Sequence, residues 1–171
     1  VLERVNRLLV VESQDGLFVT AFYAILNTKT GILTYANAGH NLPLIIHAKD
    51  RIVEKLQRGG MALGVRSANK LEDQSLEITK GDSLLLYTDG VTESFTAEGN
   101  AFGEERLIAA LQSASSNRVE ELKNHLRTVM SEYLGGEPLS DDLTLFFLHR
   151  FLEENPQSPT HAAENDRAAI N

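Results

Sequence analysis

Apolar segments of strand length follow one another through residues 18–88, with only short polar or glycine-containing turns between them. The two strongest helical patterns are grouped later in the chain, at residues 104–114 and 117–133. A parallel sheet needs a crossover, usually a helix, between successive strands. The observed order therefore predicts an α+β fold, in which helices cover one face of an antiparallel sheet.

The expected strands are rich in β-branched and aromatic residues and end at turn residues. They cover residues 18–26, 32–38, 42–47, 51–56, 71–79, 83–88 and 143–151. Residues 83–88 are apolar on both faces, which is typical of a buried central strand. Asn117, followed by Glu120, predicts a capping box at the start of the second grouped helix, and Gly135 predicts its end.

Both ends of the chain have a distinct character. Apolar residues recur at helical spacing in residues 1–9, yet no capping residue precedes them. We therefore expect further sequence upstream of this helix. Residues 152–171 contain two prolines, several acidic residues and few large apolar side chains. They predict a disordered acidic tail that follows a single domain over residues 1–151.

Composition excludes several classes of function. The 171 residues carry 16 basic and 24 acidic side chains, giving a net charge of −8, so a nucleic-acid partner is not expected. The chain has no Cys, which removes disulfide frameworks, thiolate zinc sites and cysteine nucleophiles. The longest apolar runs are strand-sized, so we expect no membrane insertion. The absence of Cys fits a reducing compartment, and we expect a cytoplasmic protein.

Two carboxylate motifs lie where strands end or begin. Asp89 follows the strand at 83–88 and is succeeded by Gly90, while Asp141 and Asp142 precede the last strand. Carboxylates fixed at strand ends suit a divalent cation, which also relieves the repulsion between adjacent acids. Each motif also has a structural interpretation. Asp-Gly is a common hairpin turn, and an Asp pair can sit in a solvated loop.

A third motif is Gly39-His40-Asn41. Its histidine could be a general acid or a metal ligand, or a hydrogen-bonded structural residue. The spacing of the other histidines does not match a zinc site. They are His47, His125, His149 and His161.

Seven short motifs together are far more specific than any one of them. In chain order they are Phe18-Val19-Thr20-Ala21, Ala38-Gly39-His40-Asn41-Leu42-Pro43, Ala62-Leu63-Gly64-Val65, Gly81-Asp82, Tyr87-Thr88-Asp89-Gly90-Val91-Thr92-Glu93, Phe102-Gly103 and Asp141-Asp142-Leu143-Thr144. This order resembles the bacterial metal-dependent serine/threonine phosphatases of the SpoIIE/RsbU type, a branch of the type 2C-like (PPM) phosphatases. The resemblance extends from residue 1 to about residue 150.

The resemblance implies an αββα sandwich and hydrolysis of phosphoserine or phosphothreonine on a protein, usually an anti-sigma-factor antagonist. It implies two Mn²⁺ or Mg²⁺ ions, which would activate the attacking water. By position, Asp89 and Asp141 match metal ligands of the family. Asp142 and Glu93 are the next nearest carboxylates. Together with Gly90, which also serves the turn, they are expected to have weaker or indirect metal roles. Gly39, His40 and Asn41 match a signature to which we assign no role.

One departure from the family pattern has consequences. The family also has an Asp-Val/Ile-x-Gly-His-Gly motif, whose Asp bridges the metals, and this chain lacks it. We therefore expect a phosphatase domain that is incomplete at its N-terminus, with a partial metal site and little activity. Exposed sheet edges could then support a homodimer. The alternative is a non-catalytic interaction or dimerisation module with a degenerate phosphatase fold.

Overall fold

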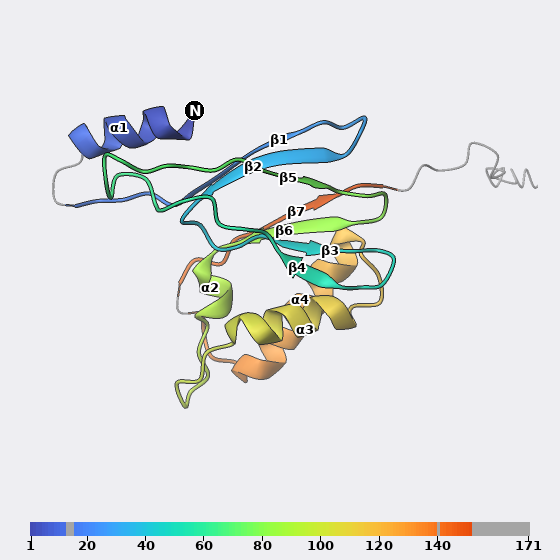
Figure 1. The fold of residues 1–171 in the computed structure, drawn as a ribbon. Coiled ribbons are helices and arrows are strands. Elements are labelled where there is room, and N and C mark those ends of the chain that lie inside the picture. The colour runs from blue at the N-terminus through green and yellow to red at the C-terminus, as the bar shows by residue number, and fades with distance from the viewer. Residues whose placement is uncertain (13–15, 140, 152–171) are drawn as a thin grey trace, which may run out of the picture.

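The computed structural model of this chain describes residues 1–12, 16–139 and 141–151. The expected tail at 152–171 lies outside the described residues. Figure 1 shows four layers: helix α1 lies over a three-stranded sheet, this sheet stacks on a four-stranded sheet, and helices α3 and α4 cover the far side. None of the helices in the described ranges has the length and apolar character needed to cross a membrane.

The elements confirm the α+β class. The helices are α1 (Leu2–Glu12), α2 (Asp89–Thr92), α3 (Gly103–Ser113) and α4 (Val119–Leu134). The strands are β1 (Ala21–Leu26), β2 (Ile32–Ala38), β3 (Leu44–Ile46), β4 (Val53–Lys55), β5 (Gln74–Glu77), β6 (Ser83–Tyr87) and β7 (Leu145–His149). They form two antiparallel sheets, ordered β1-β2-β5 and β4-β3-β6-β7.

The expectation of one sheet with helices on one face, drawn from the order of segments, is wrong. Strand β5 returns to pair with β2, whereas β6 pairs with β3. Two sheets result, and stacking them buries the apolar inner face of each. The αββα sandwich implied by the family resemblance is the arrangement observed.

Strand β6 connects the two parts of the core. Leu84 belongs to the cluster between the sheets, together with Leu33 and Ile45. Its neighbour Leu85 faces the other way, into the cluster beneath α3 and α4 that includes Phe102. Each fully buried side chain of this size stabilises the fold by about 1.5–3 kcal/mol relative to exposure. The prediction of a strand buried on both faces is confirmed.

The predicted capping box of α4 is wrong, although its predicted end is confirmed. Arg118 is the N-cap residue, and Asn117 is buried one position earlier. The Asn117 amide donates to the carbonyl of Ile46 at 3.1 Å, and its Oδ1 accepts from Arg51. These tertiary partners have replaced the local helix cap. At the other end, Gly135 adopts φ 63°, the left-handed conformation that glycine tolerates best.

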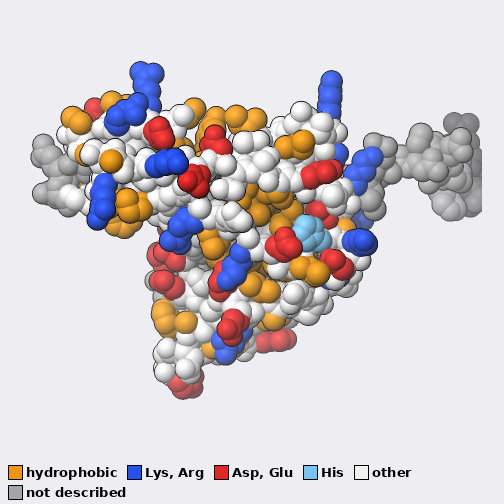
Figure 2. All heavy atoms as spheres, viewed as in Figure 1, with side chains coloured by type: hydrophobic (Ala, Val, Ile, Leu, Met, Phe, Trp, Pro, Cys, Tyr) orange, Lys and Arg blue, Asp and Glu red, His pale blue; other side chains and the backbone are white. Residues whose placement is uncertain are grey.

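One buried polar side chain links helix α1 to the loop that follows β4. Asn6 is 1% exposed, donates to the carbonyl of Arg66 at 2.9 Å and accepts from the Gly64 N–H at 2.9 Å. Beneath it, Tyr23 and Ile25 of β1 remain exposed on the outer face of the three-stranded sheet. Figure 2 shows apolar side chains interspersed with charged ones over this part of the surface. Helix α1 therefore covers only part of the outer face of the three-stranded sheet.

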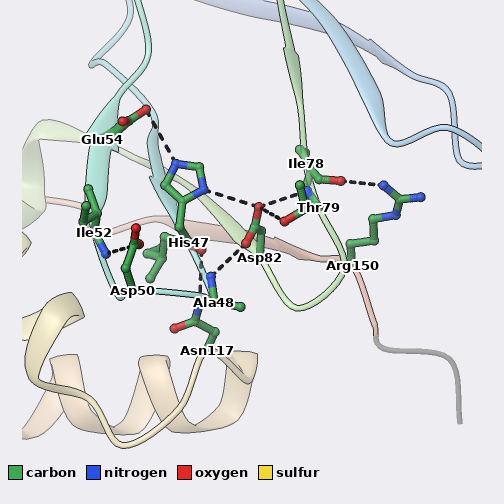
Figure 3. Close-up of polar contacts among 11 residues, drawn as sticks. His47, Ala48, Asp50, Ile52, Glu54, Ile78, Thr79, Asp82, Asn117 and Arg150 are labelled. Carbon is green, nitrogen blue, oxygen red and sulfur yellow. Dashed lines mark hydrogen bonds and ion pairs between the residues drawn. The ribbon is translucent and has the colours of Figure 1, made fainter.

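A buried carboxylate ties two turns together at one end of the sheets (Figure 3). Asp82, 1% exposed, accepts from the Ala48 N–H at 2.8 Å. It also accepts from the Thr79 N–H at 2.9 Å and the Thr79 hydroxyl at 2.8 Å. His47 Nδ1 lies 3.4 Å from the same carboxylate. Asp82 thus joins the β3–β4 turn to the β5–β6 turn.

Replacing Asp82 should therefore destabilise the fold. Asp82→Ala leaves the Ala48 and Thr79 N–H donors without their acceptor, and we expect it to lower the free energy of unfolding by about 3 kcal/mol. Urea denaturation of the chain measures this. The matched control is Asp50→Ala, which removes one exposed bond to the Ile52 N–H and should cost about 1 kcal/mol or less. Equal losses in the two variants would contradict the assigned role of Asp82.

Candidate metal centre at one end of the four-stranded sheet

Strand register brings three distant segments to the same end of the four-stranded sheet. Strand β6 is antiparallel to β3, with Leu44 opposite Leu85, and antiparallel to β7, with Tyr87 opposite Leu145. The loop before β3, the residues after β6 and the loop before β7 therefore emerge together. These segments carry the three motifs singled out from the sequence.

Asp89 lies directly after β6, as the first residue of the short helix α2. Its exposed carboxylate accepts from the Gly90 N–H through Oδ1 at 3.1 Å. Its carbonyl accepts from the Glu93 N–H at 2.7 Å, so Glu93 closes the helix. The hairpin-turn interpretation of Asp89-Gly90 is therefore wrong, because the chain enters a helix here.

Thr88 connects the Asp89 motif to the Asp141 motif. Its hydroxyl donates to the carbonyl of Asp142 at 3.1 Å and accepts from the Thr144 N–H at 3.0 Å. The Thr88 N–H also donates to the Thr144 carbonyl at 3.2 Å. The hydroxyl at this N-cap position makes no helix cap and binds the neighbouring loop instead. The sequence alone assigns Thr88 no role, although this residue lies in the motif at residues 87–93.

Gly90 is required by a close approach of the two segments. A Cβ at this position would lie 2.5 Å from the carbonyl oxygen of Asp142 and 3.5 Å from that of Asp141. Any side chain would push the loop before β7 away from α2. The expected role in a turn is thus replaced by a role in packing the two acidic segments together.

Asp141 and Asp142 are exposed in the loop before β7. Asp141 Oδ1 accepts from the Asp142 N–H at 2.7 Å, which fixes the first carboxylate against its own backbone. The structure thus places Asp89, Asp141 and Asp142 on adjoining segments, with Glu93 one helical turn beyond Asp89.

Gly39, His40 and Asn41 form a loop held by hydrogen bonds. The buried side chain of Asn37 accepts from the His40 N–H at 2.8 Å and donates to the His40 carbonyl at 3.1 Å. His40 Nδ1 lies 3.4 Å from the Thr20 hydroxyl. Gly39 has φ 74°, and a Cβ there would lie 2.6 Å from the Ala62 nitrogen. These contacts match the structural interpretation of His40.

The last residue of β6 anchors the site to α3. The buried Tyr87 hydroxyl donates to Glu104 at 3.3 Å, and Glu104 also pairs with Lys55 at 2.9 Å. Burial, reinforced by the Glu104 carboxylate, holds the pKa of Tyr87 well above its usual range. The hydroxyl therefore stays protonated and keeps its donor role.

The donor atoms at this end suit a hard divalent cation, which prefers carboxylate and carbonyl oxygens. Their number is small. Within the described ranges, no group of three or more His, Cys, Asp or Glu side chains is arranged to hold a metal ion. Asp89 and Asp141 thus have the right chemistry for part of a metal site, and a complete site needs further ligands.

Two curated proteins are similar to this chain in sequence. The chain is 30% identical over 135 residues to the protein IcfG of Synechocystis, covering 79% of this chain and 21% of IcfG. It is 30% identical over 150 residues to the phosphoserine phosphatase RsbU of Bacillus subtilis, covering 88% of this chain and 44% of RsbU. The chain thus spans less than half the length of either curated relative.

The fold is that of a known phosphatase domain. The Mn-presoaked structure of the phosphatase domain of the cell fate determinant SpoIIE from Bacillus subtilis superimposes with a TM-score of 0.66. The match covers 92% of this chain and 68% of that chain at 17% identity. The family model described as stage II sporulation protein E matches residues 1–151. The chain, with its two acidic strand-end segments joined through Thr88, therefore belongs to the SpoIIE family.

Proposed function

We propose that residues 1–151 belong to the catalytic domain of a metal-dependent serine/threonine phosphoprotein phosphatase. The observation that carries this proposal is the junction of the Asp89 and Asp141 segments by Thr88 and by the close approach at Gly90. It holds two exposed carboxylates at one end of a rigid sheet. RsbU, a phosphoserine phosphatase by name, and the Mn-presoaked SpoIIE domain support the same chemistry.

Asp89 and Asp141 are the proposed metal ligands, with Mn²⁺ or Mg²⁺ as the cofactor. Such an ion lowers the pKa of a bound water and neutralises phosphoryl oxygens. Thr88 orients the Asp141 loop through the Asp142 carbonyl and the Thr144 N–H. Asp142 and Glu93 supply further negative charge next to the two ligands. Gly90 admits the close packing that this arrangement requires.

The proposed substrate is a phosphoserine or phosphothreonine on a protein of the anti-sigma-factor antagonist type, in a cytoplasmic signalling pathway. The 171-residue chain by itself is proposed to have little activity, since its described residues offer no three-carboxylate group. The same observation favours a second candidate, a non-catalytic interaction module with a phosphatase fold. Phosphate release and Mn²⁺ binding distinguish the phosphatase from the interaction module.

Removing either proposed ligand should abolish metal-dependent turnover by the full-length protein. Asp89→Asn and Asp141→Asn each replace an anionic oxygen with a neutral amide of nearly the same size, so the fold should be retained. Release of phosphate from a phosphoprotein in the presence of Mn²⁺ is the measurement, and circular dichroism checks the fold. Asp73→Asn, an exposed change outside the site, is the control. Near-normal Mn²⁺-dependent activity in either ligand variant would refute the assignment.

Thr88 should act through the position of the Asp141 loop. Thr88→Val keeps the shape of the side chain and removes the hydroxyl, so we expect Mn²⁺ affinity of the full-length protein to fall about tenfold or more. Thr88→Ser restores the hydroxyl and should recover most of that affinity. Calorimetric titration with Mn²⁺ measures both. A valine variant that binds Mn²⁺ as tightly as the serine variant would remove Thr88 from the site.

The isolated chain provides a separate test of completeness. We expect weak Mn²⁺ binding by calorimetry and no turnover of p-nitrophenyl phosphate, because two carboxylates alone hold a divalent cation loosely. Tight binding of two ions with turnover would show that this chain supplies further ligands. If the full-length protein also proved inert, the non-catalytic module would be the better interpretation.

A further inference from the structure

A second polar site lies at the opposite end of the four-stranded sheet from Asp89. There, Ser83 at the start of β6 is paired with His149 at the end of β7. A cavity of about 470 Å³ opens beside this pair, between the α3–α4 connection and the turns before β4 and β6. Arg51, Arg118, His149 and the Ser115-Ser116 pair line it. Ala48 and Asn117, drawn in Figure 3, line it as well.

Arg51 brings a positive charge to this cavity and is held there rigidly. Its guanidinium donates to the Asn117 side chain and to the carbonyls of Leu111 at 2.8 Å and Ala114 at 2.6 Å. None of these acceptors is a carboxylate, so no full negative charge pairs with Arg51, although the carbonyls at the C-terminal end of α3 partly offset its charge. Among the described non-glycine residues, Arg51 alone has a positive φ, 63°. The surrounding contacts thus hold an unfavourable backbone conformation in place.

Arg118 adds a second positive charge to the lining, whereas the surroundings of His149 favour its neutral form. Burial lowers the pKa of the His149 imidazole, the nearby Arg118 guanidinium lowers it further, and Asp82 opposes them. Among residues 1–12, 16–139 and 141–151, neither Arg51 nor Arg118 forms an ion pair with a carboxylate.

One of the two lining serines already has a carboxylate partner. Glu121 accepts from the Ser115 hydroxyl at 2.7 Å. Two guanidiniums that pair with no carboxylate of the described residues thus line one cavity of a chain whose net charge is −8. They point to an anion from outside the chain, because a phosphate-type oxyanion accepts the donors that arginine presents.

We propose that this cavity binds a small phosphate oxyanion, either orthophosphate or the phosphoryl group of a small monoester. Arg118 supplies a charged donor, Arg51 supplies a fixed positive charge, and the Ser116 hydroxyl, which accepts from the Arg118 N–H at 3.3 Å, lies in the same lining. The site lies at the other end of β6 from Asp89 and Asp141. It therefore does not depend on the proposed phosphatase function.

The test is a titration of the 171-residue chain followed by NMR. EDTA is present, so that no divalent cation can recruit phosphate to the Asp89 end. Orthophosphate is added in one series and phosphoserine, the free amino acid, in another. We expect saturable shifts at the Ser116 and Arg118 amides and at the His149 ring, with none at Asp89. If only the orthophosphate series saturates, the site is assigned to the free ion. If the orthophosphate series and the phosphoserine series each saturate, the site is assigned to the phosphoryl group.

The matched variants are Arg118→Gln and Arg127→Gln. Both remove one positive charge from an exposed position on the same helix or its cap, but Arg127 lines a different, apolar groove beside β7. We expect Arg118→Gln to weaken phosphate binding about tenfold, the effect of losing one charged hydrogen bond. Arg127→Gln should leave binding unchanged. Equal affinities in the two variants, or shifts that chloride reproduces at the same concentration, would overturn the proposal.

Discussion

The pairing of β6 with both of its neighbours is the constraint on which the rest of the structure depends. Leu84 and Leu85 point to opposite faces of this strand, so it contributes to the core between the sheets and to the core under the helices. Because β3 and β7 both run antiparallel to it, the loops before β3 and β7 emerge at the end where β6 stops. The segments after β3 and β7 emerge at the end where β6 begins. The position of β6 therefore determines both polar ends of the four-stranded sheet.

The two ends have different chemistry for this reason. At the end where β6 stops, the Asp89 and Asp141 segments meet and are locked by the Thr88 hydroxyl. At the end where β6 begins, Asp82 joins two turns and Arg51 is bound to the end of α3. One end presents exposed carboxylates, and the other presents two guanidiniums that form no ion pair with a carboxylate of the described residues. A cation site and an anion site can thus occupy opposite ends of one rigid strand.

Membership of the SpoIIE family explains the fold, while the described residues supply only part of the proposed metal site. The distinction matters for experiments on this chain. Its fold can be studied directly, because both core clusters lie within it. Its proposed chemistry needs metal ligands beyond Asp89 and Asp141.

Sequence alone determined the element types, the α+β class and the acidic motifs, because hydrophobic periodicity and turn residues act locally. The number of sheets was decided by tertiary structure, since β5 pairs with β2 and not with β6. The capping box failed for the same reason: Asn117 is taken by Ile46 and Arg51, which are distant in sequence. The roles of Thr88, Gly90 and Arg51 likewise depend on contacts across the sheet and the helices, which no local pattern encodes.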